Sequence, residues 1–161
     1  MIKGYWIPIL HSHLPFIKHP QYDYFLEELW LFEAITECYI PLLKNLKKLT
    51  DENINFRLTI SITPPLAEML DDTHLMEKYA NYLDRQIELG KKEIKRTALD
   101  DVYKDISLFY KNSFDETKEF FNGFLNKNIL NGYRYFNDLG NIEVITCGAT
   151  HGFLPLLNVN K

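Results

Sequence analysis

Short stretches rich in apolar residues predict three β-strands. Residues 5–10 form a mostly apolar run that predicts a buried strand, although Pro8 has no N–H to donate to a neighbouring strand. In residues 54–62 apolar side chains alternate with polar ones, the pattern of a strand with one buried face. Residues 142–146 predict a third strand, directly after the turn residues Gly140 and Asn141.

Between these stretches apolar residues recur every three or four positions, which predicts helices. The first covers residues 26–49 with Cys38 on its apolar stripe, and Pro41 should kink or divide it because proline lacks an N–H. A short helix is expected to start at Pro64-Pro65, and another at the capping box of Ser113 and Glu116. Three more are expected over residues 73–96, 100–110 and 129–136.

This order of strands and helices is typical of an α/β protein with a parallel sheet. The helical part, residues 73–138, is long for one crossover and is expected to be an insertion between the second and third strands. With 161 residues and 46 % apolar side chains, residues 1–161 fit a single domain with a sizeable core.

Composition and charge exclude several classes of function. A net charge of −4 argues against a nucleic-acid-binding protein, and no apolar run is long enough for a membrane span. The first residues lack the pattern of a signal peptide. Cys38 and Cys147 lie far apart and make no metal-binding pair, so a cytoplasmic protein with reduced thiols is expected.

Three histidines follow predicted strands. His11 and His13 come directly after the first strand, and His151 follows the third, between Gly148 and Gly152. Parallel α/β proteins bind ligands at the carboxyl ends of their strands, so these three side chains are expected to converge. The two glycines permit a close backbone approach or a positive φ in the loop that carries His151.

The His-x-His pair leaves three interpretations open, because residues at i and i+2 of an extended chain point the same way. The rings can hold the loops through backbone carbonyls, contact sugar hydroxyls or a carboxylate, or bind a metal ion with His151 as the third ligand. The spacing by itself does not decide between them. Trp30, early in the first helix, is either a stacking face for a sugar ring or a core side chain.

Four segments together resemble glycoside hydrolase family 57, most closely its α-1,4-glucan branching enzymes and their relatives. Residues 4–16, with His11-Ser12-His13-Leu14-Pro15-Phe16, resemble the family's first signature region, and residues 30–43 resemble the helix that follows it. Thr63-Pro64-Pro65-Leu66 is similar to the end of the second barrel strand, and residues 147–157 resemble the second signature region.

The resemblance implies the amino-terminal portion of an incomplete (β/α)7 barrel that acts on α-glucans with retention, without a metal or another cofactor. His11, His13 and His151 would line the subsite where the bond breaks, and Trp30 is a further substrate-binding candidate. Retention needs two carboxyl groups about 5 Å apart. In the family these belong to the third and fourth signature regions; no acidic residue here matches either, so no catalytic residue is assigned.

The expected function is therefore the amino-terminal part of an α-glucan-active hydrolase or branching enzyme of glycogen or starch metabolism, inactive alone. Its expected ligand is an α-glucan or maltooligosaccharide. An open sheet exposes an edge and an apolar face, so a second chain carrying the rest of the barrel, or self-association, is also expected. The alternatives are a non-catalytic glucan-binding module and a metal-dependent, deacetylase-like hydrolase; the latter is weaker because no Asp immediately precedes His11.

Overall fold

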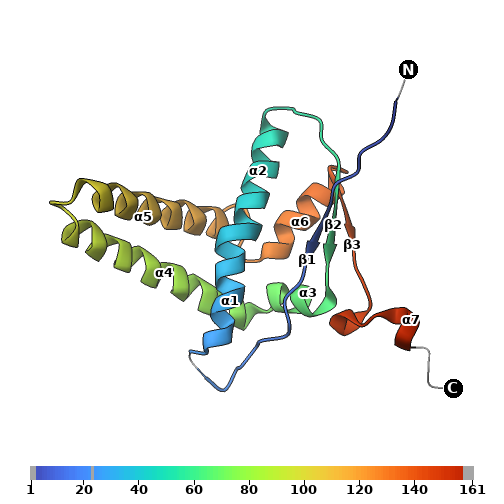
Figure 1. Ribbon diagram of the computed structural model, residues 1–161, viewed down its shortest axis with the longest axis horizontal. Helices are drawn as coiled ribbons and strands as arrows, with labels where there is room; N and C mark the ends of the chain where they lie inside the picture. The colour runs from blue at the N-terminus through green and yellow to red at the C-terminus, as the bar shows by residue number, and fades with distance from the viewer. Residues whose placement is uncertain (1–2, 23, 158–161) are drawn as a thin grey trace.

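A computed structural model describes residues 3–22 and 24–157 (Figure 1). In this part of the chain three strands, β1 (Ile9–Ser12), β2 (Leu58–Ile62) and β3 (Ile142–Ile145), form one sheet in the order β1-β2-β3. Both strand pairs are parallel. The parallel α/β sheet predicted from the order of elements is therefore confirmed.

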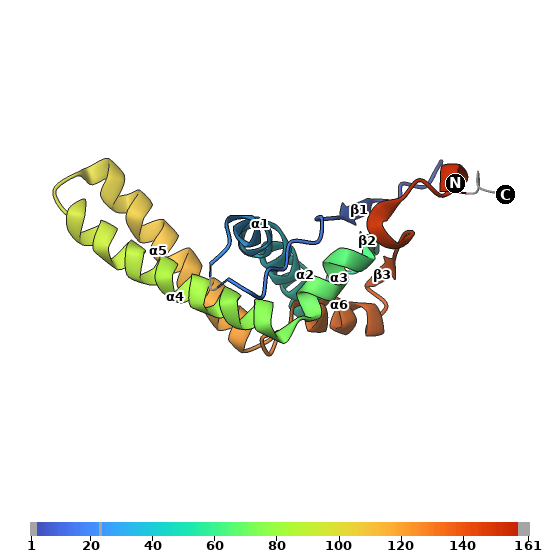
Figure 2. The same cartoon turned by 90° about the horizontal axis from the view of Figure 1, so that it is seen from below.

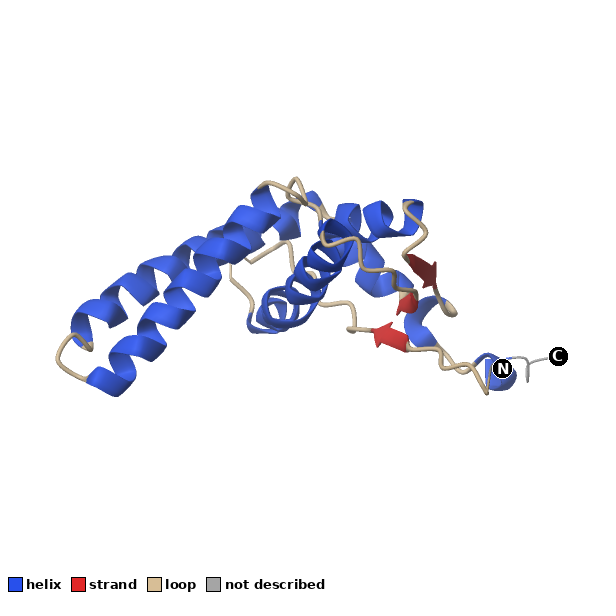
Figure 3. Cartoon of the chain, turned by 90° about the horizontal axis from the view of Figure 1, so that it is seen from above, coloured by secondary structure: helices blue, strands red, loops and turns tan. Residues whose placement is uncertain are grey.

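Helices connect consecutive strands and gather on one side of the sheet (Figure 3). The first connection contains α1 (Leu26–Ala34), the π-helical turn η1 (Ile35–Tyr39) and α2 (Ile40–Asp51). The second contains α3 (Pro64–Asp71), α4 (Thr73–Arg96), α5 (Asp101–Asn122) and α6 (Ile129–Asp138). After β3 come a 3-10 turn, η2 (Ala149–His151), and α7 (Leu154–Leu157).

The second connection confirms the predicted helical insertion. Its α4 and α5 form an antiparallel hairpin that extends away from the sheet, whereas α6 returns and packs against β3 (Figure 2). None of the helices in the described ranges combines the length and apolarity that a membrane span requires.

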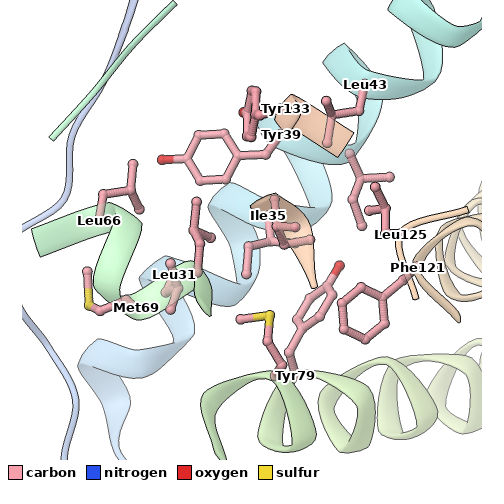
Figure 4. Packing of buried hydrophobic residues seen from close by; sticks show 14 of the residues in the cluster. Leu31, Ile35, Tyr39, Leu43, Leu66, Met69, Tyr79, Phe121, Leu125 and Tyr133 are labelled. Carbon is pink, nitrogen blue, oxygen red and sulfur yellow. The ribbon is translucent and has the colours of Figure 1, made fainter. Parts of the chain in front are cut away.

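The core joins the base of this hairpin to the first helix. Leu31 and Ile35 pack with Met69 of α3, Tyr79 of α4 and Phe121 of α5, and all five side chains are fully buried (Figure 4). The rings of Tyr79 and Phe121 meet edge to face, with centroids 5.0 Å apart. This packing connects segments that lie far apart in the sequence, so it holds the α4–α5 hairpin against α1 and α3 beside the sheet.

The first helix divides just before Pro41, as predicted. Proline has no N–H for the usual i to i−4 hydrogen bond, and the π turn η1 precedes it. The extra residue of a π turn shifts the buried stripe by one position, so Tyr39 and Leu43 are buried. The prediction that Cys38 lies on the apolar stripe was therefore wrong, because its side chain is exposed.

The first two strands are shorter than predicted. β1 begins at Ile9 instead of residue 5, and Pro8 takes part only as an acceptor, from the Thr59 N–H at 3.1 Å. The expectation of a buried strand was also wrong: Ile9 is 60 % exposed and Leu10 is 41 % exposed, because β1 is an edge strand and the described residues do not fully cover either of its faces. β2 begins at Leu58, where the register with β3 starts, so residues 54–57 stay outside the ladder.

The long helix α5 replaces the two predicted ones. Its first turn is capped by Asp100, whose carboxylate accepts from the N–H groups of Val102 and Tyr103 at 3.2 and 3.1 Å. The predicted capping box of Ser113 and Glu116 lies inside this helix, so no helix begins there. A capping box acts only where the chain enters a helix, and here contacts with α4 continue the helix through it.

Candidate functional site

Two histidines and two hydroxyl residues form consecutive cross-strand pairs at the carboxyl ends of β1 and β2. His11 is paired with Ser61 in the parallel register. The ladder continues past β1, since the Thr63 N–H donates to the Ser12 carbonyl at 3.1 Å, which brings His13 beside Thr63. Side chains of a strand alternate between faces, so all four lie on the same face of the sheet.

Each imidazole contacts the hydroxyl group of the residue beside it on the neighbouring strand. His11 Nδ1 lies 3.2 Å from Ser61 Oγ, and His13 Nδ1 lies 3.1 Å from Thr63 Oγ1. The two rings are nearly parallel, with an interplanar angle of 17° and centroids 6.3 Å apart. Both histidines are exposed, whereas Ser61 and Thr63 are buried. These contacts hold the two imidazoles side by side at the carboxyl ends of the strands.

The structure corrects the position of one histidine and adds two residues. His11 lies within β1 and not in the loop after it. Ser61 and Thr63 were not among the predicted site residues, although a signal was present: Thr59 and Ser61 of β2, and Thr63 directly after it, carry hydroxyl groups at every second position. On a half-buried strand that pattern also describes an ordinary solvent-facing side, so it does not mark a site by itself.

The loop after β3 reaches the same end of the sheet. Thr146 Oγ1 donates to the carbonyl of Ile62 at 2.9 Å, and η2 contacts α3. This places the backbone of His151 beside the carboxyl ends of the strands, while its side chain lies outside the described residues. Its position among the substrate-binding residues stays a prediction.

The glycines of this loop allow a close approach and not a positive φ. Gly148 and Gly152 both have negative φ, and the positive φ in this turn, 59°, belongs to Thr150. A Cβ on Gly148 would lie 2.8 Å from Leu154 Cδ2, and one on Gly152 would lie 2.9 Å from Leu157 Cδ1. The missing side chains therefore let α7 fold back onto the loop.

Trp30 is not a core residue. It lies on α1 with 52 % of its surface exposed, and no ring contact in the described part of the chain joins it to His11 or His13. Its assignment as a stacking face for a sugar stays a prediction.

The loop that leaves His13 is held by contacts of residues 17–19. Ile17 is buried in the core, and Lys18 forms an ion pair with Asp72 at the start of α4. Burial tends to raise the pKa of Asp72, but the hydrogen bonds and charge of Lys18 and the backbone N–H groups of α4 outweigh it, so this pKa is lowered. Further along, the His19 N–H donates to Glu28 at 3.1 Å.

Among side chains that the structure describes, no three His, Cys, Asp or Glu residues are placed to hold a metal ion.

Comparison with known proteins places this geometry in a family. The model of glycosyl hydrolase family 57 matches residues 7–161. The 1,4-alpha-glucan branching enzyme of Thermococcus kodakarensis is 36 % identical over 157 residues, which cover 97 % of this chain and 22 % of that enzyme.

Solved structures agree with this match. A novel alpha-amylase, AmyC, from Thermotoga maritima has a TM-score of 0.86 and 47 % identity, over 94 % of this chain and 28 % of that one. The GH57-type branching enzyme of Pyrococcus horikoshii has a TM-score of 0.88 and 35 % identity, over 96 % and 29 %. The chain thus spans less than a third of each relative. Its three parallel strands confirm the predicted amino-terminal portion of a (β/α)7 barrel, and the chain belongs to glycosyl hydrolase family 57.

Proposed function

We propose that this chain is the amino-terminal part of an α-glucan-active enzyme of the branching-enzyme type and contributes one half of its substrate site. The observation that carries the proposal is the double pairing of His11 with Ser61 and of His13 with Thr63, on the exposed face at the carboxyl ends of parallel strands. That is the end of a barrel sheet where enzymes of this architecture bind substrates. The relatives named as branching enzymes and amylase support an α-glucan as the ligand.

The proposed roles follow from the chemistry of the side chains. The imidazoles of His11, His13 and His151 would hydrogen-bond to sugar hydroxyls or to a catalytic carboxylate supplied by the rest of the barrel. Trp30, half exposed on α1, would stack on a sugar ring. None of these side chains is proposed as the nucleophile or the acid/base, because retention requires two carboxyl groups about 5 Å apart.

Titration with a maltooligosaccharide tests this proposal directly. We expect saturable binding by calorimetry or NMR line broadening, and a clear loss in the His13→Ala variant. His74→Ala is the matched control, because His74 is an exposed histidine on α4. A folded chain that binds no maltooligosaccharide, or binds it equally well after His13→Ala, would contradict the proposed half-site. Metal analysis of the same sample tests the metal-dependent alternative, which requires a stoichiometric ion.

Activity is expected only when the rest of a family 57 barrel is present. The face of the sheet that carries His11 is only partly covered, since Ile9 and Ile145 on this face are 60 % and 39 % exposed. A second chain carrying the remaining strands, or a second copy of this chain, would cover that apolar surface. Co-expression with the carboxyl-terminal part of a related enzyme should yield a stable complex that modifies amylose, and the 161-residue polypeptide alone should not.

A non-catalytic glucan-binding module is the second candidate. It is favoured by the fact that both histidine–hydroxyl pairs form entirely within this chain. The two candidates predict different activities for the complex with a complementing chain: a module would bind glycogen, but no complementing chain would give an active complex.

Linkage analysis of the products would distinguish branching from hydrolysis. Fractionation of the source cells would test the proposed cytoplasmic location.

A further inference from the structure

We propose that Ser61 and Thr63 are positioning residues that hold His11 and His13 in a single neutral tautomer, with the proton on Nε2. The inference deepens the proposed function and rests on it for its meaning, since it states how the half-site would be prepared for a sugar. It depends on three observations about these four side chains.

The first observation is that one arrangement occurs twice. Each histidine lies 50 residues before its hydroxyl partner, and each pair joins Nδ1 to the hydroxyl oxygen, at 3.2 Å for His11 and 3.1 Å for His13. The pairs are two positions apart on adjacent parallel strands, so the strand geometry repeats the contact. The resulting rings are nearly parallel, at 17°.

The second observation concerns the direction of the hydrogen bonds. Ser61 and Thr63 are 7 % and 0 % exposed, and within residues 3–22 and 24–157 the imidazole Nδ1 is the one hydrogen-bond partner of each hydroxyl. A buried O–H that donates to nothing is costly, whereas an oxygen with an unused lone pair is tolerated more readily. Each hydroxyl therefore donates to Nδ1, which puts the ring proton on Nε2.

The third observation is that Thr63 does not make the hydrogen bond that its position favours. It is the N-cap residue of α3, where a threonine side chain usually accepts from a backbone N–H of the first turn, yet it makes no such bond. Pro64 and Pro65 remove two of the N–H groups of that turn. The Thr63 hydroxyl contacts the His13 ring instead, as expected for a side chain that orients this ring.

The consequence is a pair of aligned N–H donors. Nδ1 and Nε2 lie on opposite sides of Cε1, so a hydroxyl that holds Nδ1 also determines where Nε2 points. Two Nε2–H groups suit oxygen acceptors, either the hydroxyl groups of a sugar or a carboxylate. A hydroxyl behind each histidine thus acts as the outer partners of metal-bound histidines do, by fixing tautomer and orientation.

Nitrogen NMR of the histidine rings tests this inference without any sugar. Long-range nitrogen–proton spectra at a pH of about 8, where an ordinary histidine is neutral, distinguish the two tautomers. We expect His11 and His13 as Nε2–H tautomers in the unmodified chain. Thr63→Val should convert His13 to a mixture and leave His11 unchanged, Ser61→Ala should do the reverse, and Thr63→Ser should restore His13.

Thr59→Val is the matched control, because Thr59 lies on the same face but opposite Ile9, and it should change neither ring. A proton on Nδ1 in the unmodified chain, or unchanged tautomers in both Ser61→Ala and Thr63→Val, would overturn the inference. If Thr63→Val does not fold, the Ser61–His11 pair decides the question by itself.

Binding measurements then connect the tautomers with the ligand. Loss of one orienting hydrogen bond should weaken maltooligosaccharide binding by about 3- to 10-fold, with recovery in Thr63→Ser. Tautomers that respond as described in a chain that binds no maltooligosaccharide would support the positioning role and overturn the proposed function. Binding that persists while the tautomers fail to respond would do the opposite.

Discussion

Lys78 and Glu28 join α4 to α1 through a buried ion pair. The Lys78 ammonium lies 2.9 and 3.1 Å from the two carboxylate oxygens of Glu28, and it also donates to the carbonyl of Tyr22 at 2.7 Å. Glu28 is 1 % exposed and accepts from the His19 N–H as well. The pair thus ties the loop that follows the histidines to the hairpin.

Removing one partner of this pair should destabilise the protein strongly. Lys78→Met leaves a buried carboxylate without its counter-ion, so the free energy of unfolding should fall by about 3–5 kcal/mol in urea denaturation. The double variant Glu28→Gln/Lys78→Met should recover part of the loss. Lys91→Met is the control: its pair with Glu88 is exposed, so it should leave the urea midpoint nearly unchanged. A loss equally small in Lys78→Met would contradict a buried pair.

Asp72 should make the stability depend on pH in the acid range. Its pKa is lower in the folded chain than the usual value of about 4, since Lys18 and the start of α4 favour the carboxylate. Its contribution is therefore complete above the unfolded pKa and is lost as the pH falls through the lower folded pKa.

Asp72→Asn keeps an N-cap side chain but removes the charge. Urea unfolding midpoints should fall less steeply below a pH of about 4 in this variant than in the unmodified chain. Equal slopes would show that Asp72 does not titrate differently in the two states.

Two buried tyrosines should respond in opposite ways to loss of the hydroxyl. The Tyr133 hydroxyl is buried with no hydrogen-bond partner in the described part of the chain, whereas the Tyr79 hydroxyl lies 3.0 Å from Thr36 Oγ1. Tyr133→Phe should raise the free energy of unfolding by about 1 kcal/mol, and Tyr79→Phe should lower it by about 1 kcal/mol. Thermal and urea unfolding would measure both, and a destabilised Tyr133→Phe would reveal a hydrogen bond at that hydroxyl.

Gly132 should not tolerate alanine, although alanine is the better helix former. A Cβ at this position of α6 would lie 2.7 Å from Leu125 Cδ2 and 2.8 Å from Leu43 Cδ1, in a fully packed core. We expect a loss of about 1–3 kcal/mol. Gly4→Ala, which has open space around the added methyl group, should change the unfolding midpoint little. An equally stable Gly132→Ala would mean that the two leucines move aside.

Much of the fold could be predicted from local patterns in the sequence. The limits of α4, the start of α6 and the third strand depend on residues a few positions apart, and the structure agrees with each of them to within one residue. The segment Thr63-Pro64-Pro65-Leu66 also follows the end of β2, as the resemblance implied.

Other features depend on residues that are distant in the sequence. Contacts with α4 carry α5 through its internal capping box, and the π turn moves the buried stripe from Cys38 to Tyr39. The first effect depends on what packs against α5, so a local pattern does not contain it. Pro41 predicts a break in the first helix but not the π turn that shifts its buried stripe.

The candidate site was likewise predictable only in part from the sequence. The sequence alone predicted His11 and His13 as site residues, because they follow an apolar run and match a family segment. Their partners Ser61 and Thr63 lie 50 residues further along the chain. Only the parallel register of β1 and β2 brings them together, because strand pairing is a tertiary contact between segments that share no local pattern.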